Sequence, residues 1–330
     1  MAYVAATMPK TLSPSAAALK RFSRNETIFR RFTFGAACLV LLVFAGLIAA
    51  LGNGAWPALS TFGLPFLTST AWNPVTAKFG ALPAIYGTLI TSALAMLIAV
   101  PVGIGTAIFL TELCPRPLRR PVGIAIELLA GIPSIIYGIW GLFVFAPFFQ
   151  QFVEPRVVSA FENIPLLSDL FAGPPYGIGI FTASLILSIM ILPFISAVTR
   201  DVFETVPPML KEAAYGLGCT KREVTWNVVL PFARSGVVGG SMLALGRALG
   251  ETMAVTFVIG NAHAISSSLF APGTTISATI ANEFTEAVGD LYVSSLVAVG
   301  LILFVITFLV LAVAQLMLRR LEARAGGRAQ

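Results

Sequence analysis

The sequence predicts an all-α polytopic membrane protein with six transmembrane helices and both termini in the cytoplasm. Hydrophobic residues make up 57% of the 330 residues and charged residues only 11%, whereas about a quarter of an ordinary soluble domain is charged. Several apolar runs reach the roughly 20 residues that an α-helix needs to cross a bilayer. The placement of the basic residues then predicts the orientation of these helices.

Six apolar spans make up the expected transmembrane domain, residues 33–318. They are predicted at about 33–51, 82–110, 121–149, 176–199, 231–260 and 292–318. The first run is longer than the apolar part of a typical signal peptide, so we expect it to be retained as a helix. Residues 1–32 then form an N-terminal lead, and residues 319–330 form a basic tail.

The lysine and arginine residues are concentrated on one side of these spans. Eighteen of the 21 fall in the segments 1–32, 111–120, 200–234 and 319–330. Cytoplasmic loops carry such an excess of basic residues, so these four segments are predicted to be cytoplasmic. The segment 276–284, on the other side, is expected to form a short amphipathic helix at the membrane surface.

Three other classes of protein fit the sequence poorly. The net charge of +6 lies in short loops beside the spans, which disfavours nucleic-acid binding. Three separated cysteines and one histidine provide neither a disulfide framework nor a metal site. The spans contain no histidine, lysine or aspartate that an intramembrane hydrolase would use, and no Walker-type phosphate motif occurs.

The segment 200–231 contains a long polar insert between two apolar spans. Glu212, Ala213 and Ala214 favour a helix, and Gly218 is expected to end it in a turn. Thr220, followed three residues later by Glu223, predicts a capping box and a second helix. A helix-turn-helix at a membrane surface provides a structure that a partner outside the membrane can bind.

The insert ends at Leu230 and Pro231, where the fifth span begins. Within this span Arg247 and Glu251 are four residues apart, so on one helix they would share a face and pair. Such charges in a bilayer usually face the interior of a bundle or an aqueous cavity. Either they form an ion pair that locks helices together, or Arg247 binds an anion and Glu251 orients it or acts as a gate.

Two further patterns concern the backbone of the spans. The spacing of Gly236 and Gly240 allows close helix packing and favours a subunit interface on the fifth span. The sequence Gly131-Ile132-Pro133-Ser134 predicts a kink or break in the third span and a possible hinge. Glu127, just before it, is expected to be a helix-end carboxylate near the lipid headgroups.

Several motifs resemble one family of transporters. The pattern from Glu212-Ala-Ala through Gly218 to Val228-x-Leu230-Pro231 resembles the EAA loop of ABC importer permeases. The stretches 86–90, 127–138 and above all 245–261 are similar to the PstC-type permease subunits of phosphate ABC importers. The likeness covers roughly residues 30–320, and the stretch that starts at Arg247 is what narrows it to phosphate.

This resemblance implies a type I importer permease of the MetI-like fold, in a bacterial plasma (inner) membrane. It implies a PstA-type sister permease, a dimeric PstB-type ATPase and a periplasmic or lipid-anchored phosphate-binding protein. It places ATP and Mg on the ATPase, so this chain would be a non-catalytic subunit without a cofactor. The EAA residues Glu212, Ala213, Ala214, Gly218, Leu230 and Pro231 would contact the ATPase, and Arg247 and Glu251 would lie on the path of the phosphate ion.

Two alternatives remain open from the sequence. The chain is a permease for another oxyanion, such as sulfate, molybdate or phosphonate, or it is a phosphate-responsive signalling scaffold in the membrane. Competition among oxyanions in an uptake assay discriminates the first alternative. Intact coupling to the ATPase without any flux of substrate would favour the second.

Overall fold

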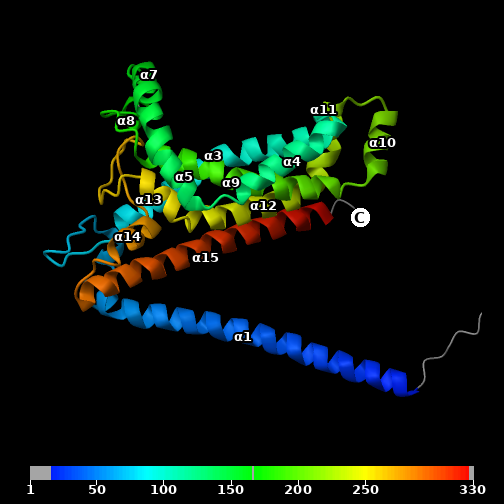
Figure 1. Ribbon diagram of the computed structural model, residues 1–330, viewed down its shortest axis with the longest axis horizontal. Helices are drawn as coiled ribbons and strands as arrows, with labels where there is room; N and C mark the ends of the chain where they lie inside the picture. The colour runs from blue at the N-terminus through cyan, green and yellow to red at the C-terminus, as the bar shows by residue number, and fades with distance from the viewer. Residues whose placement is uncertain (1–15, 166, 327–330) are drawn as a thin grey trace, which may run out of the picture. The chain divides into compact units, whose positions relative to one another are not determined.

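The computed structural model describes residues 16–165 and 167–326, and these segments are α-helices joined by short connections (Figure 1). Six helices in these segments are long and apolar enough to cross a membrane. This observation confirms the predicted all-α fold with six spans. The chain divides into two units, Met1–Asn53 and Gly54–Gln330.

Helix α1 (Ala16–Phe62) runs through the first unit and into the second. Its side chains from residue 25 to residue 50 are exposed and predominantly apolar, which suits a helix surrounded by lipid. The helix is longer than the predicted first span, 33–51, because it begins at Ala16 and continues past Pro57 to Phe62. Within the second unit, Ala55 and Ala58 are buried, and the Ala58 backbone N–H donates to Ser294 Oγ.

The second unit is built around α9 (Ile180–Glu204), the most deeply buried of the spans. It packs against α3 (Leu82–Ile108), α4 (Arg116–Ala130) and α12 (Leu230–Leu249). The core at α9 is formed by Leu187, Met190 and Ile191 with small residues of the neighbouring helices. Since the lipid around a membrane helix is as apolar as its side chains, close packing of small residues holds such helices together.

The remaining helices complete the two ends of this unit. Figure 1 shows α10 and α11 at one end, and α13 and α14 at the other; we name these the α10 end and the α14 end. The last helix, α15 (Asp290–Gly326), is long. The short helices are α2 (Pro65–Thr68), α5 (Ser134–Trp140), α6 (Ala146–Phe148), α7 (Glu154–Phe161), α8 (Leu167–Leu170), α10 (Pro208–Gly216), α11 (Lys221–Val224), α13 (Met253–Val258) and α14 (Ile276–Glu283). Single π-helical turns lie at Phe109–Leu113, Gly141–Phe145, Phe149–Val153 and Thr225–Val229.

The third and fifth spans are each interrupted, and so differ from the continuous segments 121–149 and 231–260. Between α4 and α5 the chain leaves the helix at Gly131 and re-enters it at Ser134, because Pro133 cannot donate to the helical hydrogen bonds. Between α12 and α13 the break comes at Gly250. The long apolar helical run of the third segment is therefore displaced to Ser134–Phe161.

Helix α14 forms in the predicted segment, and its first half is buried in the protein. Ile276, Ser277, Ala278 and Thr279 are all buried among other parts of the protein. The backbone N–H of Ile276 donates to the Thr88 hydroxyl of α3 at 2.9 Å. Buried hydroxyls therefore satisfy the start of this helix, which lets it lie inside the fold.

The close-packing motif on α12 acts within the chain. A Cβ added at Gly236 would lie 2.5 Å from Val202 of α9, and one at Gly240 would lie 2.7 Å from Val198. The two glycines therefore bring α12 against α9. Because α9 occupies this face, the predicted subunit interface on α12 would have to use another face of the helix.

We predict that Gly236→Ala lowers the thermal unfolding midpoint of the purified chain. The added methyl group must displace Val202, and overpacking of this kind costs about 1–3 kcal/mol. Gly239→Ala is the matched control, because no atom lies within 4 Å of a Cβ at that position. Alanine favours a helix over glycine by up to about 1 kcal/mol, so the control is expected to be neutral or stabilising. Equal effects of the two substitutions would contradict the packing described above.

Candidate functional site

Arg247 is a charged residue near the end of a predominantly apolar helix. It lies in the last turn of α12 and its side chain is exposed in the single chain. Its guanidinium carbon lies 4.5 Å from the centre of the Phe194 ring of α9, a cation–π contact. Leu243, one turn earlier, is 73% exposed. An exposed arginine in a membrane span is costly, so this face of α12 needs a protein partner or water beside it.

Glu251 does not share a helix with Arg247, so the predicted pairing of the two on one helical face is wrong. Helix α12 ends at Leu249, and Gly250 turns the chain. Glu251 Oε1 instead accepts a hydrogen bond from the Ala254 backbone N–H at 3.3 Å. The carboxylate therefore lies at the start of α13, where an acidic group is favoured by the helix dipole.

The two interrupted spans meet at their breaks. Helices α5 and α13 run in the same direction, since Gly138 faces Ala254 and Gly141 faces Val258. A Cβ at Gly138 would lie 3.0 Å from the Met253 carbonyl oxygen, so the backbones are in close contact. The starts of the two helices, at Ser134 and Met253, are therefore at a similar level of the bundle.

At the break of Gly131, Pro133 and Ser134, the Leu129 carbonyl receives two hydrogen bonds that replace its helical one. The Ile132 backbone N–H donates to the Leu129 carbonyl at 3.3 Å, and the Tyr137 hydroxyl donates to the same oxygen at 2.8 Å. A carbonyl released by a helix break is costly in a membrane unless such donors replace the helical hydrogen bond. The residues that the sequence proposes as a hinge thus lie at a stable discontinuity.

The helix-turn-helix of the segment 200–231 is present at the α10 end. Helix α10 ends at Gly216, and Gly218 follows with φ +87°, a conformation that glycine adopts without strain. The Thr220 side chain accepts from the Glu223 backbone N–H, and the Glu223 carboxylate accepts from Thr220, which confirms the predicted capping box.

Helix α10 is held to the bundle by one strong ion pair and offers an apolar face. Lys211 Nζ lies 2.6 Å from Glu112 Oε1, at the end of the span that begins with α3. Met209 is 76% exposed and Leu217 87%. Burial, together with the negative charge of Glu112, raises the pKa of Tyr215. Within the described chain no residue of α10 is buried, so most of its surface is open to a partner.

Leu230 and Pro231 lie within a continuous helical run from Lys221 to Leu249, not at its start. The π-helical turn Thr225–Val229 precedes them. Such a turn changes the hydrogen-bond pattern locally and accommodates the missing N–H of Pro231. One helical rod therefore connects the capping box to Arg247.

A polar cluster that was not predicted from the sequence lies at the α14 end. His263 Nε2 lies 2.6 Å from Glu283 Oε1, while Trp72 Nε1 and the Tyr292 hydroxyl donate to Oε2 at 2.7 and 2.6 Å. The rings of Trp72 and His263 are stacked with centroids 5.2 Å apart. Burial raises the pKa of Glu283, but hydrogen bonds from His263, Tyr292 and Trp72 together hold it below its usual range. The only sign of this cluster in the sequence is the single histidine, His263.

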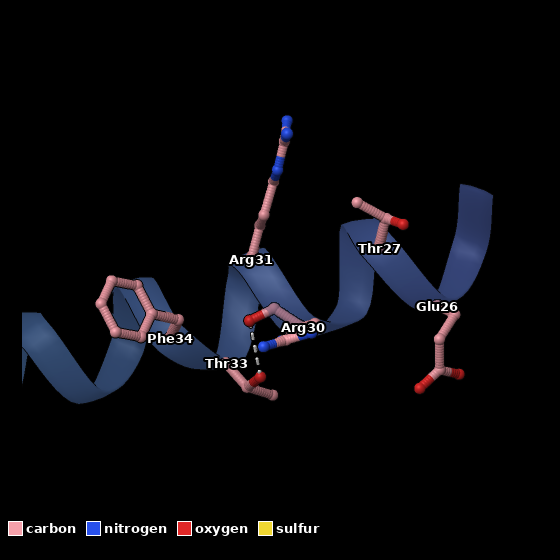
Figure 2. Close-up of a pocket in the computed structure, with 6 residues that line it drawn as sticks. All are labelled: Glu26, Thr27, Arg30, Arg31, Thr33 and Phe34. Carbon is pink, nitrogen blue, oxygen red and sulfur yellow. Dashed lines mark hydrogen bonds between the residues drawn. The ribbon is translucent and has the colours of Figure 1, made fainter. Parts of the chain in front are cut away.

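An open hollow beside α1 does not form a binding site (Figure 2). Its six lining residues come from one helix and are all exposed, and Arg31 and Glu26 point in opposite directions. The Thr33 hydroxyl donates to the Arg30 carbonyl within the same helix. A ligand site needs side chains that converge from more than one element, and this surface lacks them.

Comparison with protein families matches residues 99–323 to the model described as "Binding-protein-dependent transport system inner membrane component". The phosphate transport system permease protein PstC of Mesorhizobium japonicum is 68% identical, over 99% of this chain and 100% of the relative. That of Pasteurella multocida is 57% identical, over 91% and 94% of the two chains. The probable permease of the same name from Methanocaldococcus jannaschii is 36% identical, over 88% and 93%.

Comparison with solved structures identifies the fold. The bacterial alginate ABC transporter, in complex with its pentasaccharide-bound periplasmic protein, contains a chain that matches with a TM-score of 0.60 and 19% identity. The match covers 91% of this chain and 96% of that one. A chain of the inward-facing MetNI methionine ABC transporter matches with a TM-score of 0.50 and 18% identity, over 73% and 94%. The chain thus has the MetI-like fold of ABC importer permeases.

We predict that the Glu283 cluster makes the stability of the chain depend on pH in the acidic range. Because the pKa of Glu283 is lowered in the folded protein, its contribution is complete above the ordinary value of 4.5 and is lost as the pH falls through the lower folded value. Thermal unfolding midpoints measured on either side of pH 4.5 check this. Glu283→Gln is expected to lose about 2 kcal/mol at neutral pH and to flatten the acid dependence.

Glu286→Gln is the control, because Glu286 is an exposed carboxyl three residues away. It is expected to leave both the midpoint and its acid dependence near those of the unchanged chain. An acid dependence that Glu283→Gln leaves intact would show that other carboxyls are responsible for it.

Proposed function

We propose that this chain carries inorganic phosphate across the membrane. It belongs to the PstC family of binding-protein-dependent transport system inner membrane components. It is a membrane-spanning permease subunit and not an enzyme. The importer to which it belongs is driven by ATP that a partner subunit hydrolyses. The observation that carries the proposal within this chain is the exposed Arg247 in a membrane-crossing helix.

Arg247 is suited to bind the substrate anion. The guanidinium is planar and permanently charged, and it donates two parallel hydrogen bonds to a pair of phosphate oxygens. Its position above Phe194 leaves the group oriented but without a carboxylate partner among the described residues. An arginine paired with Glu251 would have been neutralised, so the separation of these two residues supports an anion-binding role over a locking ion pair.

Glu251 and the segment Gly131–Ser134 are proposed to regulate this path. Glu251 caps α13, and α13 packs on α5 directly after the break in the third span. A displacement of the chain at either break would therefore shift the helix that packs against it. Glycine and proline at these positions provide the backbone freedom that a hinge requires. The carboxylate of Glu251 is placed to repel an anion when the path is closed.

The EAA loop is proposed to transmit the work of the ATPase. Glu212, Ala213 and Ala214 lie on α10, whose exposed surface suits insertion into a cleft of an ATPase subunit. Gly218 and the capping box fix the angle between α10 and α11. The helical run through Leu230 and Pro231 then connects α11 to Arg247. A displacement of α10 is therefore passed to the anion site along a single helix.

The partners follow from this arrangement. The exposed face of α12 with Leu243 and Arg247 suits a sister permease of PstA type, which would enclose the path between two chains. A PstB-type ATPase dimer, with ATP and Mg, would bind at the α10 end. A periplasmic or lipid-anchored phosphate-binding protein would deliver substrate at the α14 end. The excess of basic residues supports this orientation, with both termini in the cytoplasm.

A permease for another oxyanion is the second candidate, because an arginine fork also fits sulfate or molybdate. Uptake of labelled phosphate in the presence of an excess of sulfate, molybdate or phosphonate separates the two. If unlabelled phosphate reduces the uptake of labelled phosphate and the other oxyanions do not, the result supports phosphate as the substrate. A signalling scaffold would show ATPase coupling without uptake.

We predict that Arg247→Ala reduces ATP-driven phosphate uptake by about 10- to 100-fold. The loss of a charge-assisted contact costs about 1.5–3 kcal/mol, and 1.4 kcal/mol corresponds to a factor of ten. Uptake of labelled phosphate is measured in cells that produce the variant as the only copy, and co-purification of the ATPase checks assembly. Arg30→Ala is the control, since Arg30 is an exposed arginine of another apolar helix. Normal uptake by Arg247→Ala would refute the role of this residue.

We predict that Glu212→Lys weakens the association with the ATPase and leaves the chain inserted in the membrane. Glu212 is exposed on α10, so the reversed charge acts on the partner more than on the fold. The amount of ATPase that co-purifies with the tagged chain is the measurement. Glu26→Lys makes the same charge change on α1 and is expected to have no effect. If both variants retained the ATPase equally, α10 would not be the docking element.

A further inference from the structure

A polar groove lies between α4 and α9 at the α10 end, away from the residues assigned above. It encloses about 290 Å³. Its lining residues are Arg116, Arg119, Arg120, Gly123, Ile124, Glu127, Arg200 and Glu204. The groove thus brings together four arginines from two helices, against two carboxylates. Such a hollow has room for a small anion and a surplus of positive charge to hold it.

Arg200 is the deepest of these arginines. Its Nη2 atom lies 2.7 Å from Glu127 Oε1 and 3.3 Å from Asp201 Oδ1. Its Nε atom is buried and has no hydrogen-bond partner among the described residues. A buried donor without an acceptor costs about 1–3 kcal/mol, so an acceptor that enters the groove would be stabilised there. Glu127, which was expected to be a headgroup-level carboxylate, is the ion-pair partner of this arginine.

The arginines of α4 occupy an unfavourable position for cations. Arg116, Arg119 and Arg120 lie in the first two turns of this 15-residue helix, where the helix dipole is positive. The first turn of α4 holds no acidic residue. The Arg119 guanidinium donates to the Thr111 carbonyl at 2.6 Å, which holds it beside the groove. Three like charges at a positive helix end are destabilising unless an anion lies among them.

The surroundings of the groove are apolar and face outward. Leu118 is 53% exposed, Ile124 47% and Leu128 68%, all on α4. Arginines beside such side chains are typical of a helix that meets the acyl chains and headgroups of a lipid. A phosphate group is the anion that matches the arginine fork, and it reaches this end either in a lipid headgroup or as a free ion.

We propose that the groove between α4 and α9 is a binding site for a phosphate group, held by Arg116 and Arg120 with Arg119 and Arg200 in support. In this site Glu127 competes with the anion for Arg200. None of these residues is among those of the transport path, so the site stands whether or not Arg247 binds the transported ion. It gives the chain an anion contact beside the π-helical turn Phe109–Leu113, where Glu112 holds α10.

The test uses the purified full-length chain and two probes. Native mass spectrometry measures retention of phosphatidylglycerol against phosphatidylcholine, and titration calorimetry in a zwitterionic detergent measures binding of inorganic phosphate. Arg116→Gln with Arg120→Gln removes two groove charges, and Arg30→Gln with Arg31→Gln removes two exposed charges of α1 as a matched control. The phosphate titration is repeated on Arg247→Ala to separate the transport path.

Preferential retention of phosphatidylglycerol that falls about tenfold in the groove variant, and not in the control, identifies a lipid headgroup site. Binding of inorganic phosphate that falls by the same factor in the groove variant, and persists in Arg247→Ala, identifies a free-ion site. Glu127→Gln is expected to tighten binding severalfold in either case, because it frees Arg200. The site is overturned if the groove variant binds both probes as well as the unchanged chain does, or if the control variant loses as much binding as the groove variant. Unchanged binding by Glu127→Gln overturns the part assigned to Arg200.

Discussion

The cost of placing a guanidinium in a membrane-crossing helix constrains the rest of this structure. Arg247 cannot face lipid acyl chains, and α9 provides only the face of Phe194 on one side. The exposed face of α12 must therefore be covered by protein or lined by water. This cost is the physical reason for the proposed second permease, which would complete the path beside Arg247.

The same constraint explains why the two helix breaks lie where they do. Irregular backbone is tolerated at membrane depth only where it is buried in protein or lines a cavity. The break at Gly131 is satisfied by the Tyr137 hydroxyl, and the break at Gly250 is followed by a helix that Glu251 caps. Because α5 and α13 pack side by side in the same direction, the two breaks lie at a similar level of the bundle. Gly131, Pro133 and Gly250 are exposed in the single chain, so both breaks need a protein partner or water beside them. The polar groups of the proposed path are therefore concentrated at one level of the bundle.

Local chemistry made much of the fold predictable from sequence, and long-range contacts made the rest unpredictable. The six apolar spans, the capping box at Thr220 and the turn at Gly218 depend on neighbouring residues and were expected. The end of α12 at Leu249 was not expected, since one glycine costs a helix only about 1 kcal/mol. The packing of α13 on α5 decides where α12 ends. The Glu283 cluster joins residues that lie up to 220 positions apart, from Trp72 to Tyr292, so no spacing rule reveals it.

The two ends of the second unit are built by different means, and this difference bears on motion. At the α14 end, one partly buried carboxylate receives three hydrogen-bonding side chains from different segments, so these segments are held together as a rigid group. At the α10 end, the Lys211–Glu112 pair joins α10 to the π-helical turn that follows α3, and α10 buries no residue of its own. Elements with few buried contacts open and move most easily. We therefore propose that a force applied at α10 moves the helical rod that carries Arg247, with the α14 end as the fixed frame against which that rod is displaced.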